Sequence, residues 1–276
     1  MKDVKIAWSG ITGRTGMEAL ARVKDAPNVK IVAGLMRNAN YTTSKLLADI
    51  IYDGGACGMT CRQGWFELGV ADYLERDFLG WTYKMLRLDL EYGKALFITL
   101  VMDVIVDFSH PSVFDTVLDL AVRTHVPLIS GTSGLGVKQM NRLQEAAKEI
   151  PIFRGGNFRF KVKKFLDDAV ELAKSSDSNL TLYENFYEGK SLPSETAKVL
   201  RRKIQEATGK VIGVSSRADL PKEDLECQWQ FGNVVCKTEG FGELAENVLQ
   251  IARIMATKKP KGSFYELDDI WEEVNL

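Results

Sequence analysis

The chain has 276 residues, which is long enough for one large domain or two modest ones, each with its own core. Its formal net charge of −1 argues against a nucleic-acid-binding protein that relies on a basic face, whereas a few placed cations are enough for a small anionic ligand. The most apolar stretch, residues 95–108, is interrupted by Asp103 and is too short to span a bilayer. We therefore expect neither a nucleic-acid partner nor a membrane protein.

The N-terminus and the cysteines bear on the location of the protein. The sequence MKDVKIAW leads directly into a strand-like run, without the apolar core and cleavage site of a signal peptide. Two of the four cysteines have the spacing of half a metal site, but no histidine is near any of them in the sequence: Cys57, Cys61, Cys227 and Cys236. We expect thiols, no bound metal and a cytoplasmic protein.

Residues 5–36 predict a strand, a glycine turn, a helix and a second strand, which is the size of one βαβ unit. The strands are Lys5–Trp8 and Val29–Met36, and the helix is Met17–Val23. The turn between them is GITGRTG, and a dinucleotide pyrophosphate needs such a turn because backbone N–H groups must approach it without an intervening side chain. The residues that we predict to contact the cofactor here are Gly10, Thr12, Gly13, Arg14, Thr15 and Gly16; the alternative is a purely structural turn.

Two arginines bear on the choice of dinucleotide. In NAD-binding units the second strand usually ends in an acid that accepts hydrogen bonds from the adenosine ribose. Here the strand ends in Leu35, Met36 and Arg37, and Arg14 lies in the loop. A guanidinium can pair bidentately with a 2′-phosphate, so we expect NADPH, with NADH as the second choice and a solvated Arg37 as the alternative.

The segment 38–97 receives no assignment beyond helical patches at Ser44–Tyr52 and Tyr83–Tyr92. After this segment, predicted strands and helices alternate again. The strands are at 103–108, 127–130 and 152–154 and the helices at 111–124 and 137–149. Turns that follow strands of a parallel sheet lie at its carboxyl edge, where cofactor and substrate bind. We predict nicotinamide contacts from two such turns, through Phe108, Ser109, Gly131, Thr132 and Ser133, although both could be plain strand-to-helix connections.

Beyond Asn157 the pattern changes to helices at 161–175 and 194–207, a strand at 180–186 and strand-like runs over 211–237. A last helix covers 243–257. We infer an α/β protein: a Rossmann-type, doubly wound parallel sheet with an inserted smaller α+β domain. The dinucleotide-binding domain is predicted as 1–157 completed by 242–276, and the smaller domain as 158–241.

The motifs together resemble the dihydrodipicolinate reductase family (4-hydroxy-tetrahydrodipicolinate reductase of lysine and diaminopimelate synthesis). GITGRTG, VIVDFSHPS, ISGTSGLG, GGNF, GKSLPSETAKVL and KKPKGSFYELDDIW stand in the family's order. The resemblance implies a cytoplasmic homotetramer that delivers a nicotinamide hydride to a cyclic unsaturated imine dicarboxylate. It further implies that the smaller domain, 158–241, serves substrate binding and oligomerisation. The implied contacts are a hinge with a cofactor contact at Asn157, and substrate contacts at Lys190, Ser194, Glu195 and Thr196.

The chain departs from the family where a proton donor is expected. Asn185, Phe186 and Tyr187 stand where the family carries a histidine pair, and Glu195 replaces a glycine. Lys190 is then the first candidate for the proton donor and Tyr187 the second. Ser191 or Ser194 could instead only cap this helix, with Pro193 in its first turn. The alternatives are a reductase of another cyclic imine, a nucleotide-binding sensor without turnover, and a sugar or amino-acid dehydrogenase.

Overall fold

The structure is a computed structural model that describes residues 3–11, 13–35, 102–155, 157–190, 192–221, 226–258 and 263–274. The chain divides into two compact units: Met1–Gly155 with Ala245–Leu276, and Gly156–Leu244. Several sequence-based expectations lie outside the described residues: Thr12, Arg37, Cys57, Cys61, Ser191 and the segment 38–97 with its helical patches. Within the described residues, no helix is long and apolar enough to cross a membrane.

The first unit contains a six-stranded sheet in the order β10-β5-β4-β3-β1-β2. Every neighbouring pair of strands is parallel. This confirms the predicted doubly wound parallel sheet. The strands are β1 (Val4–Ser9), β2 (Val29–Leu35), β3 (Val104–Asp107), β4 (Leu128–Ser130), β5 (Ile152–Phe153) and β10 (Phe264–Tyr265).

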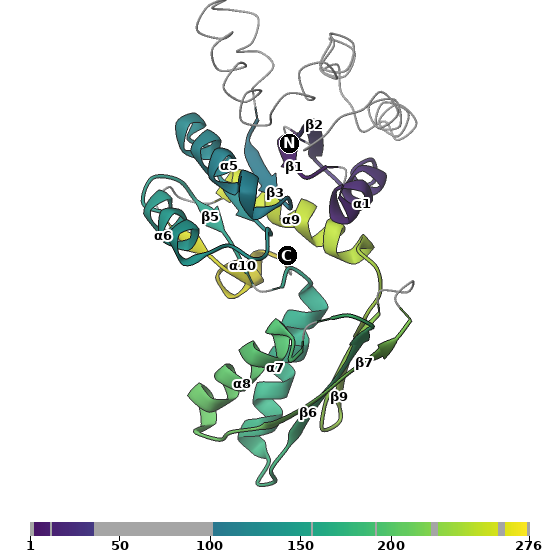
Figure 1. Ribbon diagram of the computed structural model, residues 1–276. Helices are drawn as coiled ribbons and strands as arrows, with labels where there is room; N and C mark the ends of the chain where they lie inside the picture. The colour runs from purple at the N-terminus through teal and green to yellow at the C-terminus, as the bar shows by residue number, and fades with distance from the viewer. Residues whose placement is uncertain are drawn as a thin grey trace, which may run out of the picture. The chain divides into compact units, whose positions relative to one another are not determined.

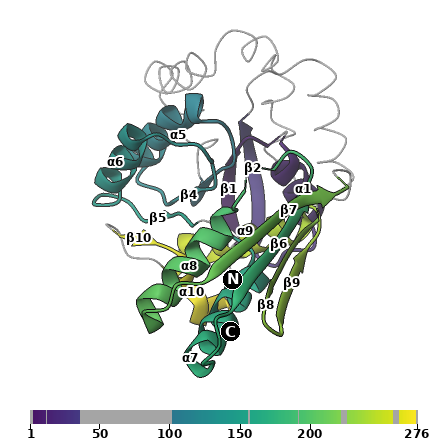
Figure 2. The same ribbon diagram turned by 60° about the horizontal axis from the view of Figure 1, so that its bottom comes forward.

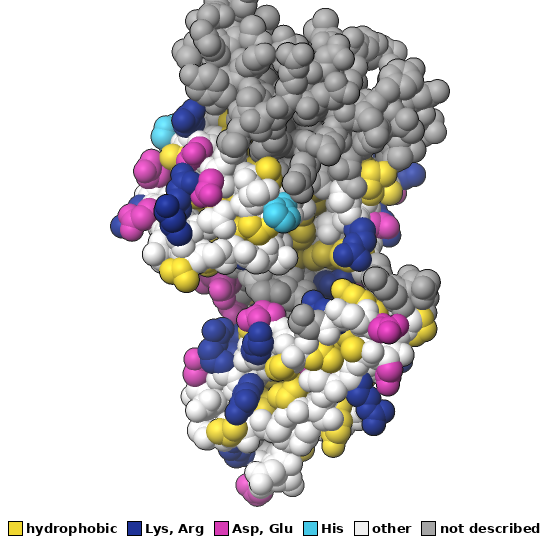
Figure 3. Space-filling model, in the orientation of Figure 1, with side chains coloured by type: hydrophobic (Ala, Val, Ile, Leu, Met, Phe, Trp, Pro, Cys, Tyr) yellow, Lys and Arg dark blue, Asp and Glu magenta, His cyan; other side chains and the backbone are white. Residues whose placement is uncertain are grey.

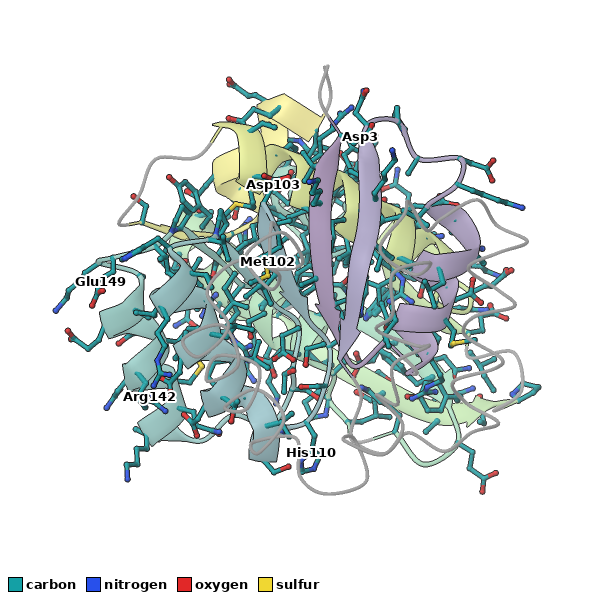
Figure 4. The ribbon with its side chains drawn as sticks, turned by 90° about the horizontal axis from the view of Figure 1, so that it is seen from above. Asp3, Met102, Asp103, His110, Arg142 and Glu149 are labelled. Atoms are coloured by element: carbon teal, nitrogen blue, oxygen red, sulfur yellow. The ribbon has the colours of Figure 1, made fainter. Side chains whose placement is uncertain are left out.

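Helices cover both faces of this sheet. The chain leaves β1 toward β2 on one side and runs from β3 through β4 to β5 on the other, so right-handed crossovers put the connecting helices on opposite faces. Figure 4 shows α5 and α6 on one side of the sheet and α1 on the other. The helices of this unit are α1 (Arg14–Arg22), α5 (Pro111–Thr124), α6 (Val137–Ala146), α9 (Gly242–Lys258) and α10 (Leu267–Val274).

The core of the first unit consists of strands that are buried on both faces, as parallel strands between helix layers are. All four residues of β3 and all three of β4 are buried. Trp8 on β1 and Phe114 on α5 are among the largest fully buried side chains. This packing fixes the carboxyl ends of the strands, which is where the turns of interest begin.

The second unit is a four-stranded mixed sheet in the order β7-β6-β8-β9, with two helices on one face (Figures 1 and 2). Along β6 the residues alternate: Leu182, Glu184 and Phe186 are buried, and Tyr183 on the other face is exposed. Its elements are α7 (Phe160–Ser175), β6 (Thr181–Tyr187), α8 (Glu195–Thr208), β7 (Gly213–Leu220), β8 (Cys227–Phe231) and β9 (Val234–Thr238).

Several details of the elements differ from the sequence-based prediction. Helix α1 begins at Arg14 instead of Met17, so three predicted loop residues belong to its first turn. Helix α6 ends at Ala146, before the expected 149. Pro193 precedes the N-cap Ser194 and is therefore not in the first turn of α8, which corrects that expectation. In addition, β10 and α10 form from the C-terminal segment, for which no elements were predicted.

Candidate functional site

The glycine turn after β1 is closed by its own backbone. The N–H of Gly13 donates to the carbonyl of Gly10 at 2.9 Å, and Gly10 has φ +80°. A Cβ on Gly10 would lie 2.3 Å from the carbonyl oxygen of Phe108, and one on Gly16 would lie 2.3 Å from that of Ile11. Neither position can accept a larger residue without moving backbone, so glycine is required at both.

Helix α1 begins at this turn with its amide groups uncapped by any side chain. The N-cap is Gly13, and the first turn contains no acid. The first N–H groups of a helix lack intrahelical partners and lie at the positive end of the helix dipole. Arg14 in this turn is exposed. The arrangement therefore fits the pyrophosphate of a dinucleotide, which needs close backbone approach and positive charge.

Phe108, which follows β3, contacts the turns after both neighbouring strands. Its carbonyl oxygen packs against Gly10, and its ring stacks on Trp8 with centroids 5.9 Å apart. A Cβ on Gly131, after β4, would lie 2.3 Å from the Phe108 ring. In Figure 4 His110 lies near this carboxyl edge, at the opposite end of β3 from Asp103. Phe108 therefore fixes the spacing of the three turns that border the site.

Asp107, the last residue of β3, is fully buried and ties two of these turns together. Its carboxylate accepts a hydrogen bond from the Ser109 hydroxyl at 2.5 Å and another from the Thr132 hydroxyl at 2.7 Å. The N–H of Ser109 in turn donates to the Thr132 hydroxyl at 3.0 Å. Burial raises the pKa of Asp107, and the hydrogen bonds from Ser109 and Thr132 lower it by less.

Arg154, directly after β5, completes this edge of the sheet. Its Nη1 donates to the Ser130 hydroxyl at 2.8 Å and to the Thr132 carbonyl at 3.1 Å. Burial lowers its pKa, and the charge of Asp107 opposes that shift. Arg154, Ser130 and Asp107 thus hold the turn after β4 in one conformation, which leaves Ser133 exposed at its outer side.

In the second unit, a buried carboxylate lies at the start of α8. Glu184 on β6 accepts from the N–H of Ser194 at 2.9 Å, from its hydroxyl at 2.5 Å and from the Ser216 hydroxyl at 2.6 Å. The same Ser194 hydroxyl accepts from the N–H of Ala197 at 3.1 Å and so caps the helix. The capping role considered from the sequence is therefore present.

The remaining predicted substrate residues belong to the same unit. The Thr196 hydroxyl lies 3.5 Å from the Asn157 amide nitrogen, and both belong to the second unit. The Lys190 ammonium lies 5.9 Å from the centroid of the Phe186 ring. Glu195 is turned toward solvent and pairs with Lys198 at 3.2 Å.

Tyr187 lies apart from this group. Strand alternation places it on the face of β6 opposite Phe186 and Glu184. Both predicted proton donors nevertheless belong to one short turn, since the N–H of Lys190 donates to the carbonyl of Tyr187 at 3.3 Å.

Sequence reasoning missed several residues of this architecture. An acid at the end of an otherwise apolar strand marks Asp107, and an acid between Leu182 and Phe186 marks Glu184, so a search for acids at inward positions could have found both. No comparable signal identifies Arg154. Among the described residues, no group of three or more His, Cys, Asp or Glu could hold a metal ion. Basic and acidic side chains are interspersed over the described residues on the face shown in Figure 3.

Comparison with known proteins finds similar reductases. A family model described as the N-terminus of dihydrodipicolinate reductase matches residues 80–158. The chain is 33% identical over 118 residues to the 4-hydroxy-tetrahydrodipicolinate reductase of Exiguobacterium sibiricum, which covers 42% of the chain and 47% of that protein. It is 27% identical over 206 residues to the enzyme of the same name from Thermomicrobium roseum, which covers 73% and 65%. Over these residues the chain is similar to dihydrodipicolinate reductases.

The matches cover about half to two thirds of the length of these two reductases. Among solved structures, a dipicolinate-bound dihydrodipicolinate reductase from Paenisporosarcina sp. TG-14 matches with a TM-score of 0.61 at 18% identity, over 97% of this chain and 99% of that one. GenD2 from gentamicin A biosynthesis, in complex with NAD, matches with a TM-score of 0.56 at 12% identity, over 100% and 92%. At these identities the two structures show a shared fold.

Proposed function

We propose that the chain is an NADPH-dependent reductase of a cyclic unsaturated imine dicarboxylate, of the 4-hydroxy-tetrahydrodipicolinate type. The observation that carries the proposal is the family match together with an uncapped glycine cradle at the carboxyl edge of a parallel sheet. A bound nicotinamide would supply the hydride. The glycine cradle would hold the pyrophosphate, and the turns tied by Asp107 would border the nicotinamide.

The preference for NADPH rests on positive charge. Arg14 is exposed in the first turn of α1, and that turn contains no acid to repel a 2′-phosphate. We expect a lower KM for NADPH than for NADH. Arg14→Ala should reduce the ratio of the KM for NADH to the KM for NADPH. A wild-type protein that prefers NADH would contradict the assignment.

The substrate side of the proposal rests on the second unit. The backbone N–H groups of Glu195 and Thr196 and the Thr196 hydroxyl lie in the first turn of α8, a position that suits a carboxylate. Because the Ser194 hydroxyl already donates to Glu184, Ser194 would have to exchange that partner in order to bind a ligand directly. Lys190 would polarise the bound imine and deliver the proton, with Tyr187 as the second choice.

The decisive experiment follows the oxidation of NADPH with freshly generated 4-hydroxy-tetrahydrodipicolinate. Consumption that requires both protein and substrate supports the reductase. Tight NADPH binding without consumption, with this and other cyclic imines, would instead support a nucleotide-binding sensor.

Lys190→Ala should lower kcat/KM by about 100-fold or more if Lys190 delivers the proton. Lys164→Ala is the matched control, because Lys164 is an exposed lysine that pairs with Asp168 on α7. Near-normal turnover by Lys190→Ala would remove Lys190 from the mechanism and direct attention to Tyr187.

We further propose that the protein is a homotetramer in the cytoplasm, assembled through the second unit. Tyr183 and Val235 are more than half exposed on the face of the sheet that α7 and α8 leave open. They lie in one row across the strands, because Tyr183 pairs with Gln230 and Gln230 pairs with Val235. Apolar groups in a row on an open sheet face favour association with a second copy.

A further inference from the structure

Arg159, the N-cap residue of α7, is a half-buried cation without an ion-pair partner among the described residues. Its Nη2 donates to the carbonyl of Gly240 at 2.6 Å, and its Nε is buried without any acceptor in that part of the chain. Among acidic groups, Cys227 and then Glu243 interact most strongly with its charge, and Glu243 forms its ion pair with Lys161 at 2.6 Å. Among the described residues, the Gly240 carbonyl is therefore the one hydrogen-bond acceptor of this guanidinium.

Such an arrangement is unfavourable unless an anion completes it. Removing a guanidinium from water weakens its hydration, and a single neutral carbonyl does not replace a counter-charge. Burial accordingly lowers the pKa of Arg159, although an arginine stays charged at neutral pH. Its Nη1 makes no hydrogen bond with a described residue and is not enclosed, so an anion can reach it.

Hydrogen bonds connect Arg159 to the start of α8. Its backbone N–H donates to the side-chain oxygen of Asn157 at 3.0 Å, and the amide nitrogen of Asn157 lies 3.5 Å from the Thr196 hydroxyl. Asn157 thus joins the first residue before α7 to the first turn of α8, within the second unit.

The charges of Arg159 and Lys190 both influence the thiol of Cys227. Burial raises the pKa of the Cys227 thiol, while a hydrogen bond from Thr238 and then the charges of Arg159 and Lys190 lower it. Both cations therefore lie within electrostatic reach of Cys227 at the start of β8. Arg159 thus shares the neighbour Cys227 with Lys190, and Asn157 links it to the first turn of α8.

We propose that Arg159 is the second carboxylate-binding cation of the substrate site, and that it makes the site select cyclic dicarboxylates over monocarboxylates. The inference rests on the proposed function, because it assumes that the start of α8 receives an anionic ring. One carboxylate would pair with Lys190 and the first turn of α8, and the other with the guanidinium of Arg159. A monocarboxylate would leave one cation without a counter-charge.

The test uses dipicolinate and picolinate as stable probes that differ by one carboxylate. Their dissociation constants are measured by calorimetry on the purified full chain in the presence of NADPH, for the wild type, Arg159→Gln and Arg159→Lys. Lys164→Gln, which removes an exposed charge of the same helix, is the control. We expect Arg159→Gln to weaken dipicolinate binding about tenfold or more and picolinate binding much less. Arg159→Lys should lose part of the preference, since it keeps the charge without the planar fork.

The outcomes separate the inference from the proposed function. If the wild type binds dipicolinate and Arg159→Gln binds it equally well at an unchanged Tm, the role of Arg159 is wrong while the reductase proposal stands. If Arg159→Gln does not fold, an unchanged dipicolinate-to-picolinate preference in Arg159→Lys overturns the inference. A wild type that neither binds dipicolinate nor oxidises NADPH with the imine contradicts the proposed function itself.

Discussion

At the scale of single residues, the cofactor edge depends on contacts that leave no space for a side chain. Gly131 faces the ring of Phe108, that ring stacks on Trp8, and the backbone carbonyl of Phe108 packs against Gly10. A methyl group at position 131 therefore displaces the ring of a residue that contacts the turns after β1 and β4.

We predict that Gly131→Ala lowers the free energy of unfolding by about 1–3 kcal/mol, as overpacking does, and weakens NADPH binding. Urea denaturation and a fluorescence titration with NADPH measure the two effects. Gly136→Ala is the matched control, because a Cβ there meets nothing within 4 Å. Equal stability and affinity of the two variants would show that the Phe108 ring is free to move.

The buried carboxyl of Asp107 makes a pH-dependent contribution to stability. Its pKa is raised from 3.8 by burial, so the folded chain binds this proton more tightly than the unfolded chain does. The resulting stabilisation is fully present below the unfolded pKa and is lost as pH rises through the folded pKa.

Asp107→Asn removes this titration. We therefore predict that the unfolding free energy of the wild type, taken relative to Asp107→Asn, falls as the pH is raised above about 4. Urea denaturation of both proteins across a pH series gives this difference. A difference that is constant with pH, or that grows as pH rises, contradicts the raised pKa.

At the scale of secondary-structure elements, the start of α8 is held by a strand rather than by its own sequence. Ser194 caps the helix, and the carboxylate of Glu184 on β6 fixes Ser194 through its N–H and its hydroxyl. The helix start that is proposed to receive the substrate therefore depends on a buried acid ten residues before it.

Ser194→Ala should destabilise the protein by about 1–2 kcal/mol, since it removes the cap and one donor to Glu184. The loss should be smaller in a Glu184→Gln background, with a coupling of about 0.5–3 kcal/mol in a double-mutant cycle from urea denaturation. Thr208→Val, at the other end of the same helix, is the control and should not couple to Glu184. Strict additivity of Ser194→Ala and Glu184→Gln would mean that the two side chains act independently.

The sequence predicts those elements whose ends carry local signals. Helix α5 has the predicted bounds, with Pro111 at its first position and His125 in the left-handed conformation after its last residue. The glycine turn predicts the cofactor cradle because close backbone approach depends on neighbouring residues of the sequence. Elements without such signals, including β10 and α10, are missed. The hydrogen bond from Thr132 to Asp107 spans 25 residues and the one from Ser216 to Glu184 spans 32, and only the sheet topology brings these partners together.

At the scale of the whole molecule, the sheet of the second unit has two different faces. One face packs Leu182, Phe186 and Trp229 against the core shared with α7 and α8. The other presents Tyr183 at 57% and Val235 at 56% exposure in one row. An open face with such a row is suited to pack against the same face of another copy, which would give an interface with twofold symmetry.

We predict that light scattering coupled to size exclusion gives the wild type a mass of several chains, and that Tyr183→Lys combined with Val235→Lys reduces it. Charges at the centre of a sheet-to-sheet contact would be buried without partners, which opposes association. Val211→Lys is the matched control, because Val211 is 58% exposed but lies outside the strands. A monomeric wild type, or a double variant with the wild-type mass, would rule out this face as the interface. A reduced mass with unchanged NADPH affinity would further show that the cofactor edge is complete within one chain.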